Sequence, residues 1–462
     1  MAVTARQQKK WWLLRLIGQV HLPACAPVRN ERLHDGRCCP MFRETFSSPI
    51  DPTSIPVPIA MKNSLLVLLA GTALLARAAD KIVVTVTNDL DQARPAEVIA
   101  VPFNDIKRLL PDIAPDKLFD HLLVRDGSGN AVPAQGTNFQ PEEHRDYYLD
   151  LVFQHDFAAG EKTATFTIEK TAATVAPYPA KVFARYIPER FDDFAWENDR
   201  VAHRIYGQGL DTPAAGGARM ISSGVDVWSK RVRYLIVDRW YRKGHYHSDS
   251  GEGLDMYDVG TNRGCGGTGV WDGQKLAVSH NWKTWKVLAN GPIRAVFELT
   301  YEPWDAGNGV KIAETKRFTV DAGHNLDLIE STFDFAPAPG GAGELTIAIG
   351  LTKHPKQATA SAAQDNSGAW LGLWEDFTRP ASGNLGTGVV LASAAKLAGF
   401  AETPGDRLIL AKVKPGETLA YYAGAGWKQS GDFASQEDWK AYLAAWAKRL
   451  ASPIKIAKLE AQ

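Results

Sequence analysis

The chain has 462 residues, of which 45% are hydrophobic and 23% are charged, and its formal net charge is zero. This composition is typical of a globular protein with a sizeable core, and the length allows one large domain or two smaller ones. The balanced charge excludes the overall basic composition that is typical of nucleic-acid-binding domains, so we expect no nucleic-acid partner.

The beginning of the chain differs from the rest. Residues 1–60 are rich in Pro and Arg, show no hydrophobic periodicity and hold three of the four cysteines. Met61 then begins a segment with a short basic start, an apolar run over 65–75 and a small-residue cleavage site at 76–78, which together form the pattern of a signal peptide. We therefore expect residues 1–60 to be an upstream extension from an incorrect start, disordered if it is translated, and residues 61–78 to be a signal peptide.

Only Cys265 remains once residues 1–78 are set aside, so no disulfide can form within the remaining chain. The signal peptide predicts export, and a large exported bacterial protein can dispense with disulfides because its core is large enough. No later stretch is long and apolar enough to cross a bilayer. We expect a periplasmic or extracellular bacterial protein with no membrane span after the signal peptide is cleaved.

Residues 79–180 predict a small N-terminal β-sandwich. Alternating apolar and polar residues are interrupted by Asp-Gly and Ala-Gly pairs, which is the pattern of short antiparallel strands joined by turns. The expected elements are strands at residues 81–88, 122–135, 146–157 and 161–170 and one short helix near 104–111.

Residues 181–462 predict a larger antiparallel β-supersandwich, which would be the catalytic or sugar-binding domain. Long strand-like stretches follow one another closely and are separated by Asn-Gly, Asp-Ala-Gly and Gly-Gly turns, as expected for two sheets packed face to face. The expected strands include residues 232–241, 293–304, 310–320, 325–335, 344–352 and 387–393. The predicted fold class is therefore mainly β.

A C-terminal amphipathic helix is the clearest helical pattern. Ser435 is a good N-cap, Asp438 follows it at the spacing of a capping box, and Pro453 ends the helix. We expect this helix to cover an open sheet face. Its apolar stripe consists of Trp439, Leu443, Trp446 and Leu450.

The stretch GHYHSDSGEGLDMYD, residues 244–258, concentrates groups that transfer protons or bind cations. His245 and His247 are two residues apart, so a strand would place both imidazoles on one face, with Asp249 following on that face. Such a set could bind Zn²⁺ or a similar ion, act in catalysis, or form a polar turn. We expect no cofactor, and a divalent metal at these three residues is the alternative.

Glu252 lies between Gly251 and Gly253 in the same stretch. Glycines permit positive φ and close approach of the backbone, so a carboxylate on this turn would be presented to a ligand. The alternative is an ordinary turn with solvated charges. The density of proton-transferring groups around it favours a functional site.

A second charged stretch, residues 190–207, interleaves carboxylates, arginines and a histidine with aromatic residues. If residues 196–206 form one strand, Asn198, Arg200 and Arg204 share a face. Arg and Asn side chains in a groove suit the recognition of carboxylates and hydroxyl groups. The alternative is an ion-pair network between strands.

Two further stretches mix polar groups with aromatic rings. SHNWKTWK contains His280, and YYAGAGWKQSGDF contains Trp427 and Lys428. Trp and Tyr rings pack on the apolar faces of sugars as readily as they fill cores, so these side chains are candidates for binding a carbohydrate. The sequence has no phosphate loop, dinucleotide fingerprint, G-x-S-x-G elbow or H-E-x-x-H motif.

Several stretches, taken as an ordered set, resemble a family of secreted bacterial proteins known as a domain of unknown function. They are FAWENDRVAHRIYG, YHSDSGEGLDMYDVG, RGCGGTGVWDGQKL, NGPIRAVFEL and YYAGAGWKQSGDFASQEDWKAYLAAWAKRLASPIKI, and the resemblance covers about residues 80–458. It implies an association with the breakdown of uronate-containing polysaccharides. It also implies a second domain like the β-supersandwich shared by sugar mutarotases and several polysaccharide lyases.

The central motif of that family usually reads Tyr-His, then Asp, His, Gly-Glu-Gly and Asp. Ser250 stands where the family has its second histidine, so a mechanism with two histidines would require His245 or His203. The matching residues here are Tyr246, His247, Asp249, Gly251, Glu252, Gly253 and Asp255.

These observations lead to the hypothesis of a lyase or dehydratase that acts by elimination on uronate-containing oligosaccharides or polysaccharides. The chemistry needs a base for the proton next to the carboxylate, groups that stabilise the enolate-like intermediate, and an acid for the leaving oxygen. We expect His247 as the base, Tyr246 or Tyr257 as the acid, and Asn198 with Arg200 on the carboxylate. The expected catalytic residues are His247, Tyr246, Glu252, Asp255 and His203, and the expected substrate-binding residues are Asn198, Arg200, Arg204, Asp249, His280, Trp427 and Lys428.

Two alternatives remain open. A glycoside hydrolase would pair Glu252 with Asp255 or Asp199, with the two carboxyl groups about 5–9.5 Å apart across a groove. A non-catalytic carbohydrate-binding protein would bind through its aromatic rings, and its polar clusters would only hold strands together.

Overall fold

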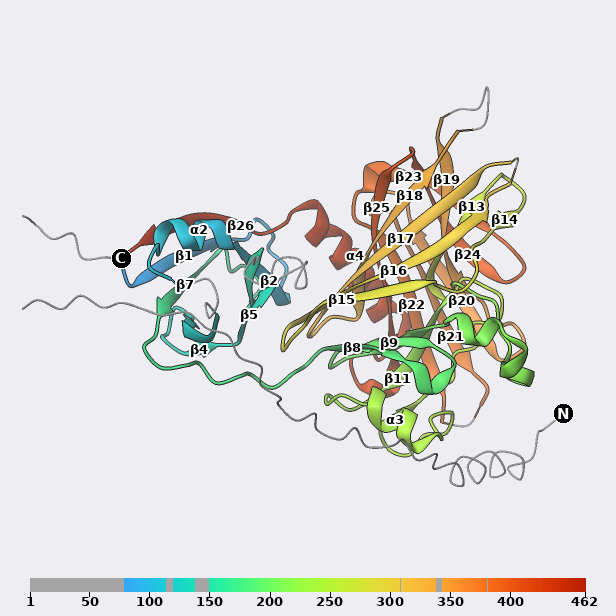
Figure 1. The fold of residues 1–462 in the computed structure, drawn as a ribbon, viewed down its shortest axis with the longest axis horizontal. Helices are drawn as coiled ribbons and strands as arrows, with labels where there is room; N and C mark the ends of the chain where they lie inside the picture. Colours follow the sequence, from blue (N-terminus) through green and yellow to red (C-terminus); the bar gives the residue numbers. More distant parts are fainter. Residues whose placement is uncertain (1–78, 114–118, 138–148, 308, 338–342, 380) are drawn as a thin grey trace, which may run out of the picture. The chain divides into compact units, whose positions relative to one another are not determined.

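The computed structural model describes residues 79–113, 119–137, 149–307, 309–337, 343–379 and 381–462 (Figure 1). The expected extension at residues 1–60 and the expected signal peptide at 61–78 lie outside this part of the chain. Within the described part the structure is mainly β, which confirms the predicted fold class.

A small sandwich consists of one sheet in the order β26-β1-β7-β3-β4 and a second in the order β2-β6-β5. Its core explains why strand β1 forms, since Ile82, Val84 and Val86 are fully buried and alternate with more exposed residues. The short helix α2, Phe103–Leu109, matches the expected one. The strands are β1 (Lys81–Thr87), β2 (Arg94–Pro102), β3 (Leu122–Arg125), β4 (Ala131–Val132), β5 (Ala134–Thr137), β6 (Asp150–Phe157), β7 (Thr163–Lys170) and β26 (Lys455–Ala461).

The last strand of the chain completes this sandwich. β26 pairs antiparallel with β1, from Ala461 opposite Ile82 to Lys455 opposite Thr87. In Figure 1 the red end of the chain therefore lies beside the blue β1. Strand periodicity cannot reveal such a pairing, because it reports which face of a strand is buried and not which distant strand lies beside it.

A larger sandwich pairs an eight-stranded sheet, in the order β15-β16-β17-β18-β25-β22-β21-β20, with a five-stranded sheet in the order β14-β13-β19-β24-β23, both counted within the described residues. Their facing side chains share one core, in which Ile329 and Tyr421 of the larger sheet and Ile347 and Ile349 of the smaller one are buried. This is the expected β-supersandwich (Figure 1). The strands are β13 (Cys265–Trp271), β14 (Leu276–Ala277), β15 (Thr284–Asn290), β16 (Arg294–Asp305), β17 (Lys311–Asp321), β18 (Leu326–Phe335), β19 (Leu345–Thr352), β20 (Ala358–Asp365), β21 (Trp370–Phe377), β22 (Gly383–Leu391), β23 (Leu397–Glu402), β24 (Asp406–Val413) and β25 (Glu417–Trp427).

The larger sandwich is accompanied by a third sheet, in the order β12-β11-β10-β9-β8, which contributes Arg204 to the candidate site and lies beside the segments that contribute the rest. Phe194 of β9 packs against Phe297 of β16 with ring centroids 4.5 Å apart, which joins this sheet to the core of the larger sandwich. The strands are β8 (Phe183–Ile187), β9 (Asp193–Glu197), β10 (Ala202–Ile205), β11 (Val225–Lys230) and β12 (Gly253–Leu254).

Strands β9 and β10 form a hairpin, so the condition that residues 196–206 form one strand is not met. The chain turns at Asn198, whose side-chain oxygen accepts hydrogen bonds from the N–H groups of Arg200 at 2.8 Å and Val201 at 3.1 Å. An Asn side chain often replaces ladder bonds in this way and favours a turn. Asn198 and Arg200 therefore do not share a strand face with Arg204.

No strand forms over residues 232–241, so that expectation is wrong: strand β11 ends at Lys230, residues 232–236 have no regular structure, and helix α3, Val237–Lys243, follows them. Its first N–H groups have no local cap. The carboxylate of Glu197, from β9, accepts hydrogen bonds from the N–H groups of Ile236 and Val237 at 2.7–2.8 Å and satisfies them instead. Because the partner comes from another strand, the local sequence pattern carries no sign of this helix.

Helix α4, Gln436–Ala451, confirms the predicted C-terminal helix, and the side chain of Ser435 accepts a hydrogen bond from the N–H group of Asp438 at 3.3 Å. The helix covers β21 and β22, with Trp439 and Leu443 buried against the sheet. Gly386 makes room for it, since a Cβ there would lie 2.7 Å from the Trp439 ring. In the part of the chain that the structure describes, no helix is long and apolar enough to cross a membrane.

Candidate active site

A cleft of about 370 Å³ lies beside the third sheet, and we call it the arginine cleft. Strand β10 contributes Arg204, the short turn Pro188–Arg190 contributes Arg190, and the segment between α3 and β13 contributes His247 and Asp255. Arg379, just after β21, comes from a distant part of the chain. The side chains that carry its chemistry are Arg190, Arg204, Tyr206, Arg219, His247, Asp255, Tyr257, Asp258, Gln357 and Arg379.

Arg204 is the buried centre of the charges in this cleft. Its Nε donates to Asp226 Oδ2 at 2.7 Å, its Nη2 to Asp255 Oδ2 at 3.0 Å and its Nη1 to the Tyr246 hydroxyl at 3.3 Å. The guanidinium also stacks over the Trp228 ring at 5.3 Å. A planar guanidinium can hold two carboxyl groups in fixed directions, which lysine cannot do.

Two buried carboxyl groups share this one guanidinium. Burial raises the pKa of both Asp226 and Asp255, and Arg204 opposes that rise only in part. Burial works against the charge on Arg204, but the two carboxylates outweigh it and raise its pKa. Burial also raises the pKa of Asp193, 3.8 Å from Arg204, to about 6. The network therefore retains protons at a pH where exposed carboxyl groups would have lost them.

His247 lines the cleft with its side chain 60% exposed, whereas Asp255 beside it is 2% exposed. Its Nδ1 lies 3.2 Å from Asp255 Oδ2 and 3.4 Å from the main-chain oxygen of the same residue. Because both contacts place acceptors at Nδ1, we assign the ring hydrogen there, and Nε2 remains for a substrate. Desolvation and the nearby charge of Arg204 lower the pKa of His247, which keeps the ring neutral at pH 7.

Arg190 and Arg379 are the two cleft arginines without a carboxylate partner. Among the described residues neither forms an ion pair, whereas Arg204 is paired with Asp226 and Arg219 with Asp211. Arg190 is half-buried and lines the cleft, and its Nη1 is a buried atom without a hydrogen-bond partner within the described chain. Arg379 donates to the main-chain oxygen of His247. Both guanidinium groups can therefore accept an anionic group from a ligand.

Three tyrosines surround this network in different ways. Tyr206 lines the cleft and donates to Asp226 Oδ2 at 3.2 Å, and burial raises its pKa well above the usual range. Tyr246 lies outside the lining, and its hydroxyl accepts from Arg204. Tyr257 lines the cleft, but its hydroxyl oxygen is buried. Tyr206 is also buried, but it differs from the other two because it both lines the cleft and is hydrogen-bonded to a carboxyl group with which it can exchange a proton.

Glu252 lies outside the arginine cleft, and its carboxylate accepts hydrogen bonds from four side chains. Its carboxylate accepts from Tyr234 at 2.9 Å, Arg239 at 2.6 Å, Trp240 at 3.2 Å and Lys243 at 2.9 Å. Partial burial would raise its pKa, but these donors outweigh burial and lower the pKa to about 2. Glu252 therefore ties the loop to helix α3 and remains ionised.

The Gly-Glu-Gly turn is shaped by Asp249. Its Oδ1 accepts from the N–H groups of Gly251 at 2.8 Å and Gly253 at 3.2 Å, and its Oδ2 pairs with Arg231. Gly253 has φ of 129°, and a Cβ there would lie 2.1 Å from the main-chain oxygen of Ser229. The glycine is required by this close approach, and the turn directs the following strand to place Asp255 behind His247.

The structure places the expected carboxylate-binding pair elsewhere. Asn198 donates to the main-chain oxygens of Asp321 and His324, both at 2.8 Å, and it is fully buried. Arg200 is paired with Asp432 at 2.7 Å. Neither residue lines the arginine cleft.

His203 is buried on the other face of β10 from Arg204. Its Nδ1 lies 3.0 Å from the main-chain oxygen of Asp226, and its Nε2 lies 3.8 Å from Asp327 Oδ2. Burial lowers the pKa of His203 to about 4 and raises the pKa of Asp327 to about 7. His203 therefore has no contact with the cleft, and it supports the sheet.

The three remaining candidates also lie outside the lining of the cleft. His280 is 70% exposed, and its Nδ1 lies 3.9 Å from Asp211, the partner of Arg219. Trp427 is buried, and its ring packs under Arg231 at 4.9 Å. Lys428 is exposed at the end of β25.

The three expected metal ligands do not converge. His245 is exposed, His247 faces Asp255, and Asp249 is paired with Arg231. Across the described ranges, no group of three or more His, Cys, Asp or Glu side chains is arranged to hold a metal ion.

Sequence reasoning missed Arg190, Tyr206, Asp226 and Arg379. Arg190 and Tyr206 lie at the two ends of the charged stretch 190–207. The stretch itself indicated a site, but the predicted site residues were taken from its central part. Arg379 follows Glu375 and Asp376 in a stretch far along the chain from the other charged cleft residues, and only the three-dimensional fold brings it beside His247.

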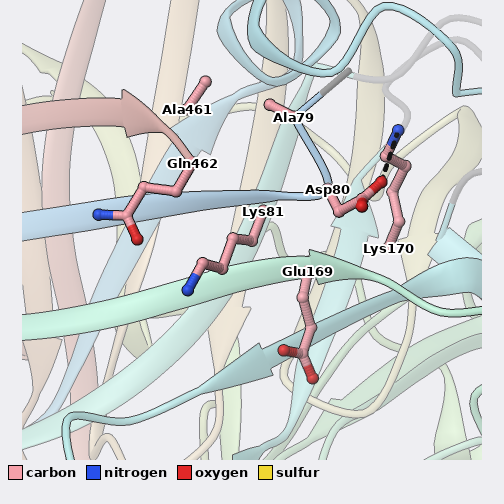
Figure 2. A pocket seen from close by; sticks show the side chains of 7 residues that line it. All are labelled: Ala79, Asp80, Lys81, Glu169, Lys170, Ala461 and Gln462. Carbon is pink, nitrogen blue, oxygen red and sulfur yellow. Dashed lines mark ion pairs between the residues drawn. The ribbon is translucent and has the colours of Figure 1, made fainter. Parts of the chain in front are cut away.

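A larger hollow, of about 510 Å³, lies at the edge of the small sandwich (Figure 2). Figure 2 shows Asp80 directed toward Lys170, with which it forms an ion pair at 3.7 Å, and Lys81 and Glu169 on neighbouring strands. Among the described residues, its lining contains no aromatic ring and no histidine. This hollow offers no arrangement for catalysis, so the arginine cleft is the candidate active site.

Comparison with known proteins supports the expected membership of a family described as a domain of unknown function. A family model for a domain of unknown function, DUF4861, matches residues 86–456. "Uncharacterized protein P7" of Formosa agariphila is 30% identical over 387 residues, which cover 81% of this chain and 92% of that protein.

Among solved structures, a glycosyl hydrolase family 38 protein from Enterococcus faecalis and an α-mannosidase from E. faecalis V583 each align with a TM-score of 0.43 and 11% identity. The alignments cover 84% and 83% of this chain but only 48% and 46% of those chains, so this chain spans about half their length. By the extent of the family match and of the Formosa relative, the chain belongs to the DUF4861 family.

Proposed function

We propose that this protein is an exported carbohydrate-active lyase or dehydratase that acts by elimination on a uronate unit bound in the arginine cleft. One observation carries the proposal. A histidine, held by a buried carboxyl group, lies in a cleft with two arginines that have no ion-pair partner among the described residues. Export rests on the signal-peptide pattern of residues 61–78.

The charges of the cleft suit a sugar acid. Arg190 and Arg379 are available to a carboxylate, and a charge-assisted hydrogen bond in a partly buried site is about twice as strong as a neutral one. A neutral sugar would leave both guanidinium groups unpaired. The substrate class that fits is therefore an oligosaccharide with an anionic unit, and a uronate also supplies an acidic proton next to its carboxyl group.

His247 is placed to begin the reaction as the base. Its Nε2 would take the proton from the carbon next to the carboxyl group, while Arg190 and Arg379 stabilise the negative charge that builds on the carboxylate. The electron pair of the broken C–H bond forms a carbon–carbon double bond, and the bond to the leaving oxygen breaks.

Tyr206 would donate the proton that the leaving oxygen needs. Asp226, whose pKa is raised by burial, lies 3.2 Å from the Tyr206 hydroxyl and can return a proton to it. The products are an unsaturated uronate and either a shortened sugar chain or water, according to whether the leaving oxygen is glycosidic or a hydroxyl group. Tyr206 thus takes the role expected for Tyr246 or Tyr257, and Arg190 and Arg379 take the role expected for Asn198 and Arg200.

The glycoside hydrolase alternative has less support from the geometry. It requires one protonated and one ionised carboxyl group facing the same bond. Glu252 is held by four donor side chains and lies outside the cleft. Asp199 also lies outside the lining, and its Oδ1 accepts from the N–H group of Gly323 at 2.6 Å.

The test is incubation of the purified protein with a panel of uronate oligosaccharides, including unsaturated ones, followed by mass spectrometry and ultraviolet absorbance. Lyase action yields products whose masses sum to that of the substrate, together with absorbance from a conjugated double bond. Dehydratase action removes one water. His247→Ala is the matched control and should abolish either change. Products heavier by one water would establish hydrolysis instead, and tight binding without any product would establish a binding protein.

A further inference from the structure

A second hollow, which we call the tryptophan hollow, has a volume of about 370 Å³. It adjoins the chain segment that contains Arg190 of the arginine cleft and Asp192 of the hollow. It lies between the edge strand β15 and the third sheet. At the other end of β15, the side chain of Asn290 joins these two elements by hydrogen bonds to the main-chain N–H and C=O groups of Ala184 in β8. Figure 1 shows β8 and β15 in this region of the larger sandwich. The lining consists of Tyr186, Asp192, Gln208, Trp282, Lys283, Thr284 and Trp285.

Trp285 presents an unusually open aromatic face. Its residue surface is 44% exposed, and it is one of four exposed large hydrophobic residues in the described chain. It stacks on Tyr186 with ring centroids 5.3 Å apart and an angle of 22° between the planes. Trp282 supports Tyr186 from an edge, at 6.0 Å. An exposed ring that is held rigidly by its neighbours offers contact area at little cost in side-chain entropy.

The polar rim of the hollow is also held in place. The Tyr186 hydroxyl donates to the Asp192 carboxylate, and this bond raises the pKa of Tyr186 to about 12. Phe191 and Asp192 both adopt positive φ, at 51° and 65°, which side chains other than glycine seldom do. Gly207 packs directly beneath them, because a Cβ there would lie 1.6 Å from the main-chain oxygen of Asp192. The surrounding structure therefore enforces a strained conformation that presents Asp192 to the hollow.

The tryptophan hollow and the arginine cleft share two stretches of chain. Arg190 lines the cleft and Asp192 lines the hollow, and in the same way Tyr206 lines the cleft and Gln208 the hollow. Residues two apart have Cα atoms no more than about 7 Å apart, so the two sites are neighbours. A ligand with several linked rings can occupy both.

The charges of the two sites differ. Within the described residues the arginine cleft has two guanidinium groups without an ion-pair partner, whereas Lys283, the cation among the described lining residues of the hollow, is paired with Glu302 at 2.9 Å. The amide of Gln208 and the hydroxyl of Thr284, which is also hydrogen-bonded to the Thr300 hydroxyl at 2.5 Å, are uncharged polar groups beside the aromatic rings. This combination suits the apolar face and the hydroxyl groups of an uncharged sugar.

We propose that the tryptophan hollow is a subsite that binds a neutral pyranose unit of the same oligosaccharide whose uronate lies in the arginine cleft. The sugar ring packs on Trp285, and Gln208 and Asp192 bond to its hydroxyl groups. The identity of the charged unit rests on the proposed function, but the stacking subsite does not depend on which bond is broken.

The test measures binding separately from turnover. In the full chain carrying His247→Ala, the dissociation constants of a uronate disaccharide and a tetrasaccharide of the same repeat are determined by calorimetry, with and without Trp285→Ala. The loss of one stacked ring should weaken the tetrasaccharide roughly tenfold and leave the disaccharide within about twofold. Trp285→Phe should retain most of the affinity. Trp271→Ala, a partly buried tryptophan on β13 outside both sites, is the matched control and should affect neither ligand.

The outcomes separate this proposal from the proposed function. An equal loss for both ligands, or no loss for either, would overturn the subsite even if the wild-type protein turns over its substrate. A loss confined to the tetrasaccharide would support the subsite even if no elimination product is found. Absence of binding by either ligand to the chain with Trp285 intact would overturn it as well.

Discussion

The imidazole of His247 is joined to the buried carboxyl group of Asp255, with Nδ1 3.2 Å from Oδ2. One partner is largely exposed and the other almost completely buried, so the pair links the surface of the arginine cleft to the charges around Arg204. Such a link orients the ring and leaves Nε2 for the substrate, which is what a general base requires.

The pair predicts the pH dependence of turnover. A base must be unprotonated, so kcat/KM should rise with pH and level off once His247 is neutral. Because desolvation and Arg204 lower the pKa of His247 below the ordinary value of 6.5, the acidic limb should lie below pH 6.5. His247→Ala should reduce kcat by about 10²–10⁴-fold and abolish that limb.

The conservative variant Asp255→Asn distinguishes a role of the Asp255 carboxyl group in orienting His247 from a role in the stability of the fold. Its side chain retains the volume and one acceptor oxygen but replaces the other oxygen with an amide N–H group, which cannot accept the Nδ1 hydrogen of His247, so kcat should fall about a hundredfold while KM changes little. A kcat unchanged in Asp255→Asn, in protein with a normal melting temperature, would show that the carboxyl group has no part in orienting His247.

The unpaired arginines predict selectivity for charge. Arg190→Gln and Arg379→Gln should each lower kcat/KM on a uronate oligosaccharide by about 10–100-fold. On the methyl ester of the same substrate, which has no carboxylate, both losses should largely disappear. Arg219→Gln is the control, because Arg219 lines the same cleft but is already paired with Asp211. Equal losses on the acid and the ester would rule out recognition of the carboxylate.

Glu252 predicts an effect on stability rather than on chemistry. Glu252→Gln should lower the free energy of unfolding by about 1–2 kcal/mol, a value discounted because Arg239 and Lys243 are about half exposed. Its folded-state pKa is lowered to about 2, so its contribution is fully present above pH 4.5 and is lost as pH falls toward 2. Denaturant titrations of wild type and variant should therefore converge on acidification. A variant that keeps its stability but has lost all turnover would instead show that Glu252 takes part in the reaction.

The fold was largely predictable because its elements have strong local signals. The alternation in β1 and the Ser435 cap with the apolar stripe of α4 report burial and capping, which are properties of neighbouring residues. Helix α3 was not predictable, since its first N–H groups are satisfied by Glu197 from β9. The pairing of β26 with β1 also depends on distant partners.

The same distinction applies to the candidate site. His247, Asp255 and Arg204 lie in the arginine cleft as part of two conspicuous charged stretches. Asn198 belongs to one of these stretches, but its side-chain oxygen is hydrogen-bonded within a turn. Glu252 belongs to the other, but its carboxylate already accepts hydrogen bonds from four donor side chains. Composition reveals where charges gather, whereas only the three-dimensional partners reveal which of them remain available to a ligand.

The buried contact between His203 and Asp327 predicts opposite pH dependences in two variants. The pKa of Asp327 is raised to about 7 from 3.8, so its contribution to stability is fully present below about pH 4 and is lost as pH rises through 7. The pKa of His203 is lowered to about 4 from 6.5, so its contribution is present above pH 6.5 and is lost as pH falls through 4. Between about pH 4 and 6.5 the two groups change the free energy of unfolding in opposite directions as pH rises. Their combined contribution to wild-type stability should therefore change little with pH in this range.

Removing one partner should reveal how the other one alone makes the free energy of unfolding depend on pH. His203→Gln should become less stable as pH rises from about 4 to 7, and Asp327→Asn should become more stable as pH rises from about 4 to 6.5, each by up to about 1.4 kcal/mol per pH unit. The measurement is the free energy of unfolding from urea titrations at several pH values, compared with wild type at each pH so that other groups cancel. Parallel curves for the two variants would mean that neither group titrates in the folded core. Because both side chains lie outside the arginine cleft, turnover at pH 7 should be retained in any variant that remains folded, which distinguishes this pair from His247 and Asp255.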